Sequence, residues 1–215
     1  MTRPVPLPVR RLPRQTLHHA WAPKLQRPIL FSSAMQLRLW IMLEANPGVT
    51  SYCERPALSV EGVTEPLADF WVMRDGSQQW LSIDDSADVQ ADAPEQQPAT
   101  QTSRSAPEVE IISREEIERH RIWIQNWMLL LPYLATGAHL IEPTLLANVV
   151  EFFDPTGTID EAEQHFPHID PVLVRTAVIA GLHSGQLISP DLVTLAFSRH
   201  TRVSRYHRGE THEAQ

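Results

Sequence analysis

The segment from residue 49 to residue 85 constrains the fold most, because it alone has the pattern of consecutive β-strands. It contains the run LADFWVMRDG, an apolar strand that begins after Asp69 and ends in Asp75-Gly76. This dipeptide predicts a hairpin turn, since glycine adopts a positive φ without steric cost. The run QWLSI is expected to return as the second strand and to end at Asp84-Asp85. The sequence therefore predicts a β-hairpin with carboxylates at its open end.

The size and composition limit the class of protein. A chain of 215 residues with 42% hydrophobic content forms one medium domain or two small ones. No run approaches the roughly 18 apolar residues of a membrane helix, and prolines stand where a signal peptide has its apolar core. We therefore expect a cytoplasmic protein without a membrane partner. The single cysteine, Cys53, excludes an internal disulfide and a cysteine-based zinc site.

Charge is strongly segregated along the chain, although the net charge is −8. Residues 1–40 carry seven basic residues and no acidic one, and residues 41–110 carry thirteen acidic and three basic residues. The C-terminal end is again rich in arginine. Basic ends favour contact with a polyanion, and arginines that only increase solubility are an equally good interpretation of the charge alone.

Residues 1–31 form a proline-rich basic segment without apolar periodicity, which we interpret as an extended arm. The pattern from Ser32 to Gly48 predicts one helix that stops at Asn46-Pro47-Gly48. Residues 86–107 contain no aromatic residue, so we expect a disordered insert there. A short strand from Val109 and a single long helix opened by the capping box SREE are then predicted, which completes an α/β domain over residues 32–137.

The C-terminal part, residues 138–206, has the pattern of a separate helical domain followed by a short tail, residues 207–215. Helices are predicted over residues 158–166 and 171–184, and QLIS with TLAFS is expected to form a β-hairpin. This order fits a winged helix, in which the second helix of the pair would face DNA. That helix offers chiefly Arg175, Thr176 and His183, so docking on a protein is an equally good interpretation.

Several segments together resemble the TnsA-type endonuclease subunit of heteromeric, cut-and-paste bacterial transposases. They are the basic arm ending in APK, the helix start FSSAMQ, the run GVTSYCERPALSV, the strand PLADFWVMRDG and the helix IISREEIERHRIWIQNWMLLLPYL. The resemblance covers nearly the whole chain. It implies a restriction-endonuclease-like core, a mixed sheet flanked by helices, with an all-α winged-helix domain at the C-terminus.

Members of this family cut DNA with a helix glutamate, an aspartate that opens the central strand, and a Glu-x-Lys or Gln-x-Lys motif on the next strand. The carboxylates hold magnesium, which activates the attacking water. Asp69 matches the aspartate, whereas Gln36 stands at the helix position, and Ser82 and Asp84 stand at the two ends of the last motif. An amide binds magnesium poorly, and an aspartate in place of the lysine reverses the charge beside the water. The resemblance thus implies a lost or impaired nuclease with no cofactor, or magnesium on Asp69 and Asp84 if the site is active.

Other carboxylates and the lysine of this chain do not easily replace the missing residues of the motif. Glu44 lies on a similar helical face to Gln36, but eight residues further on, which is about 12 Å along the axis. Lys24, the only lysine of the chain, lies in the predicted arm. Glu44, Asp84 and Asp85 therefore stay as alternative ligands only for an active enzyme.

Three functions follow as hypotheses. The first is a non-catalytic TnsA-like subunit that binds transposon-end DNA, a TnsB-like DDE transposase and a TnsC-like AAA ATPase. The second is an active metal-dependent endonuclease that cuts the 5′ strands at transposon ends, and the third is a winged-helix DNA-binding regulator. The candidate DNA-binding residues are Arg3, Arg10, Arg11, Arg14, Lys24, Arg27, Arg175, Arg199, Arg202 and Arg205.

Overall fold

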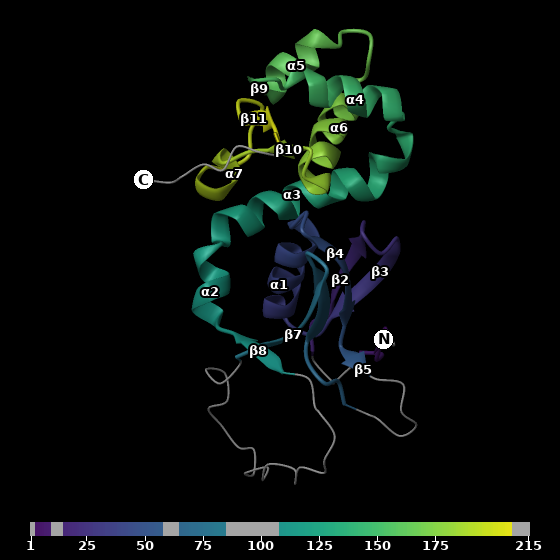
Figure 1. Ribbon diagram of the computed structural model, residues 1–215, viewed down its shortest axis with the longest axis vertical. Helices are drawn as coiled ribbons and strands as arrows, with labels where there is room; N and C mark the ends of the chain where they lie inside the picture. Colours follow the sequence, from purple (N-terminus) through teal and green to yellow (C-terminus); the bar gives the residue numbers. More distant parts are fainter. Residues whose placement is uncertain (1–2, 10–14, 58–64, 85–107, 208–215) are drawn as a thin grey trace. The chain divides into compact units, whose positions relative to one another are not determined.

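The computed structural model describes residues 3–9, 15–57, 65–84 and 108–207, and it divides into two units (Figure 1). The first unit comprises residues 1–19, 30–43 and 49–119, and the second comprises residues 20–29, 44–48 and 120–215. The insert predicted at residues 86–107 lies outside the described residues. The protein is of the mixed α/β type, with a mixed sheet flanked by helices.

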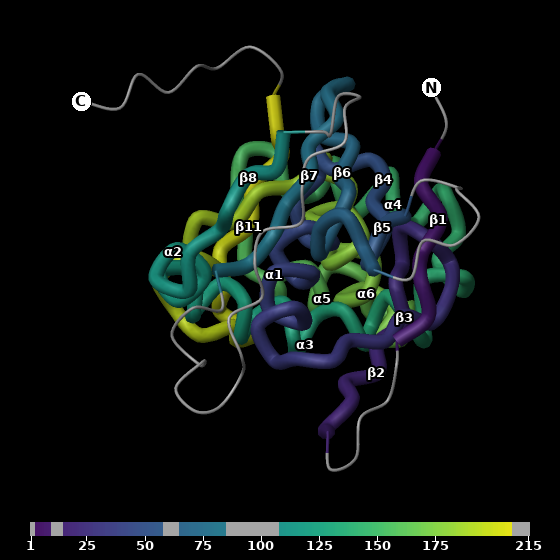
Figure 2. Tube along the Cα trace, turned by 90° about the horizontal axis from the view of Figure 1, so that it is seen from below, coloured from purple at the N-terminus to yellow at the C-terminus, as the bar shows by residue number. Residues whose placement is uncertain are grey.

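The first unit is built on a four-stranded sheet with the order β4-β6-β7-β8, which Figure 2 shows in succession. The strands are β4 (Val49–Glu54), β6 (Phe70–Arg74), β7 (Ser77–Ile83) and β8 (Val109–Ile112). The first three run antiparallel to one another, and β8 runs parallel to β7. The strand predicted from Val109 is thereby confirmed.

The predicted hairpin is confirmed as β6 and β7. Asp75 and Gly76 form its turn with φ values of 48° and 81°, and the strands pair from Arg74 with Ser77 to Phe70 with Leu81. Positive φ at both central turn residues is the geometry that aspartate followed by glycine favours.

Helix α1 (Ala34–Ala45) confirms the helix predicted after Ser32 and lies against the sheet (Figure 1). Its Trp40 donates a hydrogen bond of 2.7 Å from Nε1 to the hydroxyl of Tyr52 on β4. Phe31 packs between Trp40 and Phe70, with ring centroids 5.4 and 6.2 Å away. These buried aromatic rings make the core of the first unit.

The N-terminal segment differs from the extended arm that we expected. Strand β1 (Val5–Pro6) pairs with β5 (Pro56–Ala57), and β2 (His18–Ala22) pairs with β3 (Arg27–Phe31). Burial alternates along β2, which is the period of a strand with one covered face. Proline and basic residues concealed this pattern in the sequence.

The single helix predicted from Ser113 is two helices. Ser113 Oγ accepts a hydrogen bond of 3.1 Å from the Glu116 amide at the start of α2 (Arg114–Arg119). His120 separates this helix from α3 (Arg121–Gly137). The apolar side chains of α3 pack on α6 within the second unit, so this unit begins its main segment at residue 120 rather than at the predicted residue 138.

The helices predicted over residues 158–166 and 171–184 are confirmed in the second unit, where two further helices follow α3. In chain order, these helices are η1 (Ala138–Leu140), α4 (Pro143–Phe152), α5 (Ile159–His165) and α6 (Pro171–Ser184). Thr158 and Glu161 form a reciprocal capping box at the start of α5. Gly185 ends α6 in the left-handed conformation with φ 76°, which glycine permits.

A three-stranded antiparallel sheet of order β10-β11-β9 completes the second unit. Its strands are β9 (Thr156–Thr158), β10 (Leu187–Ile188) and β11 (Arg202–Arg205). QLIS therefore contains a strand as expected, but TLAFS does not, and α7 (Asp191–Thr194) precedes it. The amide of Asn126 on α3 explains this difference, because it donates 2.8 Å hydrogen bonds to the carbonyls of Leu192 and Leu195 and thereby holds the segment on α3.

Candidate functional site

The first unit brings together the helix, strand and strand end predicted to form the site. Asp69 immediately precedes β6, and both of its carboxylate oxygens are hydrogen-bonded. Oδ1 accepts a hydrogen bond of 2.7 Å from Nε2 of Gln36 on α1. Oδ2 accepts one of 2.8 Å from the amide of Ile83 at the end of β7. The degenerate motif positions are thus neighbours in space as well as in the resemblance.

The side chain of Gln36 is fixed by its own contacts. Its Oε1 accepts hydrogen bonds from the amide and the hydroxyl of Ser32, at 3.1 and 2.9 Å, while the Gln36 amide is capped by Ser33 Oγ at 3.1 Å. The two Ser32 donors assign the oxygen to that side, so the NH₂ group faces Asp69. Gln36 therefore links the start of α1 to the first residue before the central strand.

Ser82 and Asp84 complete the predicted set on β7. The register of β6 with β7 ends at Phe70 and Leu81. Ser82 precedes Ile83, whose amide contacts the Asp69 carboxylate. Ser82 is half-buried and Asp84 is exposed. The Asp84 amide donates 3.0 Å to the carbonyl of Ile112 and continues the pairing with β8.

This arrangement does not fit a magnesium ion. Magnesium requires several oxygen ligands at close to octahedral geometry, but the group that faces Asp69 is an amide NH₂, a donor. Asp84, which stands where the resemblance implies a lysine, carries a carboxylate and is exposed. Across the described ranges, no three His, Cys, Asp or Glu side chains form a group suited to a metal ion.

The sequence matches no known family model and none of the curated proteins. Within the described part of the chain, no helix has the length and apolar character needed to cross a membrane. The assignment of function therefore depends on the residues themselves.

Glu44, the alternative ligand, is committed to a buried cluster in the second unit. Its side chain is fully buried, and Oε1 accepts 2.9 Å hydrogen bonds from the Lys24 amide and from Nε2 of His183. The ammonium of Lys24 donates to the carbonyl of Asn46. Lys24 and His183 hence serve the interior of the unit rather than its surface.

Burial lowers the pKa of Lys24 from 10.5 to about 8, although the attraction of Glu44 opposes this shift. Between pH 8 and 10.5 the unfolded chain binds the proton that the folded protein has released, so stability rises with pH across this window. We expect a gain on the order of 2 kcal/mol from pH 8 to 10.5. This gain is measured by urea unfolding of the wild type and of Lys24→Met at several pH values across this range. An equal dependence of the unfolding free energy on pH in the two proteins would contradict the prediction. Lys24→Arg, which keeps the charge but does not titrate there, should also lose the rise.

The α6 helix, predicted to face DNA, is largely buried within the second unit. Arg175 donates from Nε and Nη2 to Oε1 of Glu163 at 2.8 and 2.6 Å, and Nη1 reaches the Tyr133 hydroxyl at 3.2 Å. Thr176 is buried and donates 2.7 Å to the carbonyl of Val172. Arg175, Thr176 and His183, the residues expected to face DNA, are therefore engaged inside the unit.

The other candidate DNA-binding residues have different surroundings. Arg199 contacts Asp160 at 2.7 Å and Glu163 at 2.8 Å, whereas Arg205 lies 3.5 Å from Asp154. Arg202 is exposed on β11. Among the N-terminal candidates, Arg3 is exposed and donates to Ser51, and Arg27 is half-buried and donates to the carbonyl of Pro28 at 3.4 Å. Residues 10, 11 and 14 lie outside the described residues.

The sequence does not predict the groups that hold Gln36 and Asp69 in place, which are Ser32 and the amide of Ile83. Ser32 is predicted only as the start of the helix pattern, and the Ile83 amide is a backbone group that no side-chain pattern indicates. The order Ser32-Ser33 before Gln36 was the available signal, since serines at a helix start accept and donate locally.

Proposed function

We propose that this protein is a non-catalytic TnsA-like subunit of a DNA transposition machinery, which binds transposon-end DNA and a partner transposase. The observation that carries the proposal is the 2.7 Å hydrogen bond from the Gln36 amide to Asp69. An amide donor here satisfies the carboxylate without a cation. In the subunit that we propose, this contact stands at two positions of the family's motif and replaces its metal chemistry.

The fold supports the same proposal. A mixed sheet whose central strands β6 and β7 carry the motif, with α1 against it, is compatible with a restriction-endonuclease-like core. In the second unit the order α4, β9, α5, α6, β10, β11 and the sheet β10-β11-β9 are compatible with a winged helix. We propose both assignments as part of the TnsA-like interpretation.

Protein docking is favoured over base reading for the C-terminal unit, because α6 exposes few side chains suited to the major groove. A reading helix presents several polar side chains to base edges. Here Arg175, Thr176 and His183 are held inside the unit. We therefore propose that this unit docks on the TnsC-like ATPase or the TnsB-like transposase, and that DNA contacts come from the N-terminal segment.

The proposed DNA contacts are tested by changing three N-terminal arginines together, Arg10→Gln, Arg11→Gln and Arg14→Gln. Truncation is unsuitable beyond residue 14, because β2 and the buried Lys24 follow. We expect weaker binding to duplex DNA and a slope of log K against log salt that flattens by about 0.9 for each lost contact. Fluorescence anisotropy at several salt concentrations measures both quantities.

The matched control removes charge from exposed arginines outside the proposed interface, with Arg119→Gln and Arg121→Gln. This control should leave the salt slope unchanged. An unchanged slope in the N-terminal variant would show that the segment makes no phosphate contacts.

A further inference from the structure

Strand β8 (Val109–Ile112) ends the sheet of the first unit. In the part of the chain that the structure describes, it pairs with β7 alone, and Figure 2 shows it at the end of the row of strands. The carbonyl of Ile112 points toward β7, where it accepts a hydrogen bond of 3.0 Å from the Asp84 amide. Successive residues of a strand direct their backbone groups to opposite sides, so the N–H and C=O groups of Val109 and Ile111 point outward. This edge can therefore continue the sheet.

The side chains at this edge differ between the two faces of the sheet, because successive side chains of a strand point to opposite faces. Val109 and Ile111 share one face, and Ile111 is 60% exposed. Val109 is in register with the half-buried Trp80 of β7, which extends the apolar surface. Glu110 projects from the other face, and Glu108 stands just before the strand. Both carboxylates are exposed.

The carboxylates limit which strand can pair with this edge. An unpaired edge with an exposed apolar side chain tends to pair with other chains, and charged side chains restrict that pairing. If β8 of a second copy paired here, the Glu108 and Glu110 carboxylates of both copies would lie along one ladder of four residues. Like charges in such a ladder are destabilising. The edge therefore disfavours self-association and suits a strand of opposite charge.

We propose that β8 binds an extended segment of a partner protein in which basic and apolar residues alternate. The segment adds a strand to the sheet, with its backbone paired to Val109 and Ile111 and its basic side chains facing Glu110. Its apolar side chains cover Ile111. In this mode of recognition the backbone hydrogen bonds supply affinity, and the alternating side chains supply specificity. The inference does not rest on the proposed role in transposition, since it concerns only β8.

The probe is the blocked peptide acetyl-Lys-Val-Lys-Val-Lys-amide, added to the full chain labelled with ¹⁵N. We expect chemical-shift changes centred on residues 108–112. The amide protons of Val109 and Ile111 should exchange more slowly with solvent, because the added strand supplies acceptors for them. The peptide acetyl-Glu-Val-Glu-Val-Glu-amide has the same alternation and the opposite charge, and it should bind at least about tenfold more weakly.

Two methylated forms of the basic peptide separate strand addition from charge attraction. One form carries N-methyl groups on its valines and the other on its lysines, so both keep the charge. In a regular strand only one of these two sets of amides points toward β8, since alternate residues point to opposite sides. One form should therefore bind at least about tenfold more weakly than the unmethylated peptide, and the other should still bind.

Two variants locate the interaction on β8. Glu110→Lys reverses the charge, and Ile111→Thr removes apolar surface while keeping a β-branched side chain. Each should weaken binding of the basic peptide by about three- to tenfold. Glu142→Lys and Val193→Thr make the same kinds of change at exposed positions of the second unit, and they should leave binding unchanged.

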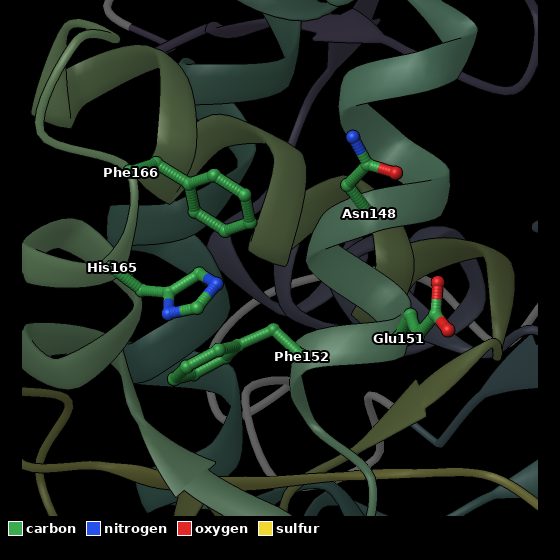
Figure 3. A pocket seen from close by; sticks show the side chains of 5 residues that line it. All are labelled: Asn148, Glu151, Phe152, His165 and Phe166. Carbon is green, nitrogen blue, oxygen red and sulfur yellow. The ribbon is translucent and has the colours of Figure 1, made fainter.

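A surface pocket of the second unit provides a contrasting location. It has a volume of about 360 Å³ and is lined by Asn148, Glu151, Phe152, His165 and Phe166. Figure 3 shows the Glu151 carboxylate turned away from the three rings. This pocket therefore does not offer a strand-like ligand an apolar surface with a carboxylate beside it, and we expect no shifts at its residues.

Three results would overturn the proposal. They are shifts that avoid residues 108–112, equal binding of the two methylated peptides, and unaltered binding by both β8 variants. A concentration-dependent dimer of the unmodified protein, with slowed exchange at Val109 and Ile111, would assign the edge to a second copy and would also overturn it. None of these results depends on whether the protein cuts or binds transposon ends.

Discussion

Replacing Glu163 by glutamine is expected to lower the free energy of unfolding by about 3–5 kcal/mol, because two arginines lose a buried counter-charge. The Glu163 side chain is only 3% exposed, and it accepts from Arg175 through one oxygen and from Arg199 through the other. The guanidinium of Arg175 is itself 20% exposed, so water compensates the lost partner poorly. Urea unfolding followed by circular dichroism measures the loss.

The control for this prediction is Glu142→Gln, which removes the same charge from an exposed position and should change stability by less than about 0.5 kcal/mol. The double variant Glu163→Leu, Arg175→Met removes both partners and should recover part of the loss, because no ion of that pair is left buried alone. A Glu163→Gln protein as stable as its parent would show that the cluster is not a structural element.

The second large effect is a gain of function in the triple variant Gln36→Glu, Ser82→Glu, Asp84→Lys. It restores carboxylates beside Asp69 and a lysine at the strand end, which together can hold a divalent cation and orient water. Without metal, the clustered carboxylates repel one another and destabilise the protein. We expect manganese to raise the unfolding temperature of the triple variant but not of the parent, and metal-dependent nicking of plasmid DNA to appear.

The matched control is the same triple variant with Asp69→Asn added, which removes the shared metal ligand and should abolish both responses. A folded triple variant that shows neither response to manganese would contradict the assignment of these four positions to one site.

Local sequence patterns predict much of the fold. Asp75-Gly76 predicts the β6–β7 turn, and local patterns predict the helices over residues 158–166 and 171–184, because both signals act between residues close in sequence. The break at His120 was missed, since one residue between two helices leaves the apolar spacing intact. TLAFS does not form the expected strand, because Asn126, 71 residues before Phe197, holds this segment on α3.

The sequence predicts which residues form the candidate site, but it does not predict the hydrogen bonds between them. Gln36 contacts Asp69, and so does Ile83, which stands between Ser82 and Asp84. Helix α1 and the ends of two neighbouring strands bring these residues together, in the order that the motif predicts. Their hydrogen bonds could not be predicted, since the Ile83 amide and the orientation of the Gln36 side chain depend on three-dimensional packing. The same is true of Arg175 and Lys24. The sequence shows that each is basic, but it does not show whether the charged group faces solvent or a buried glutamate.

Replacement of a nuclease's metal chemistry by the Gln36–Asp69 contact, as we propose, is tested by nicking of supercoiled DNA by the unmodified protein in manganese. Manganese has a higher affinity than magnesium for mixed ligand sets, so it gives a weak site the better opportunity. Asp69→Asn is the comparison, since asparagine keeps an acceptor for Gln36 or Ile83 that alanine would remove. For a non-catalytic subunit, we expect the unmodified protein to nick DNA no more than the Asp69→Asn variant does. Nicking by the unmodified protein that Asp69→Asn abolishes would contradict it.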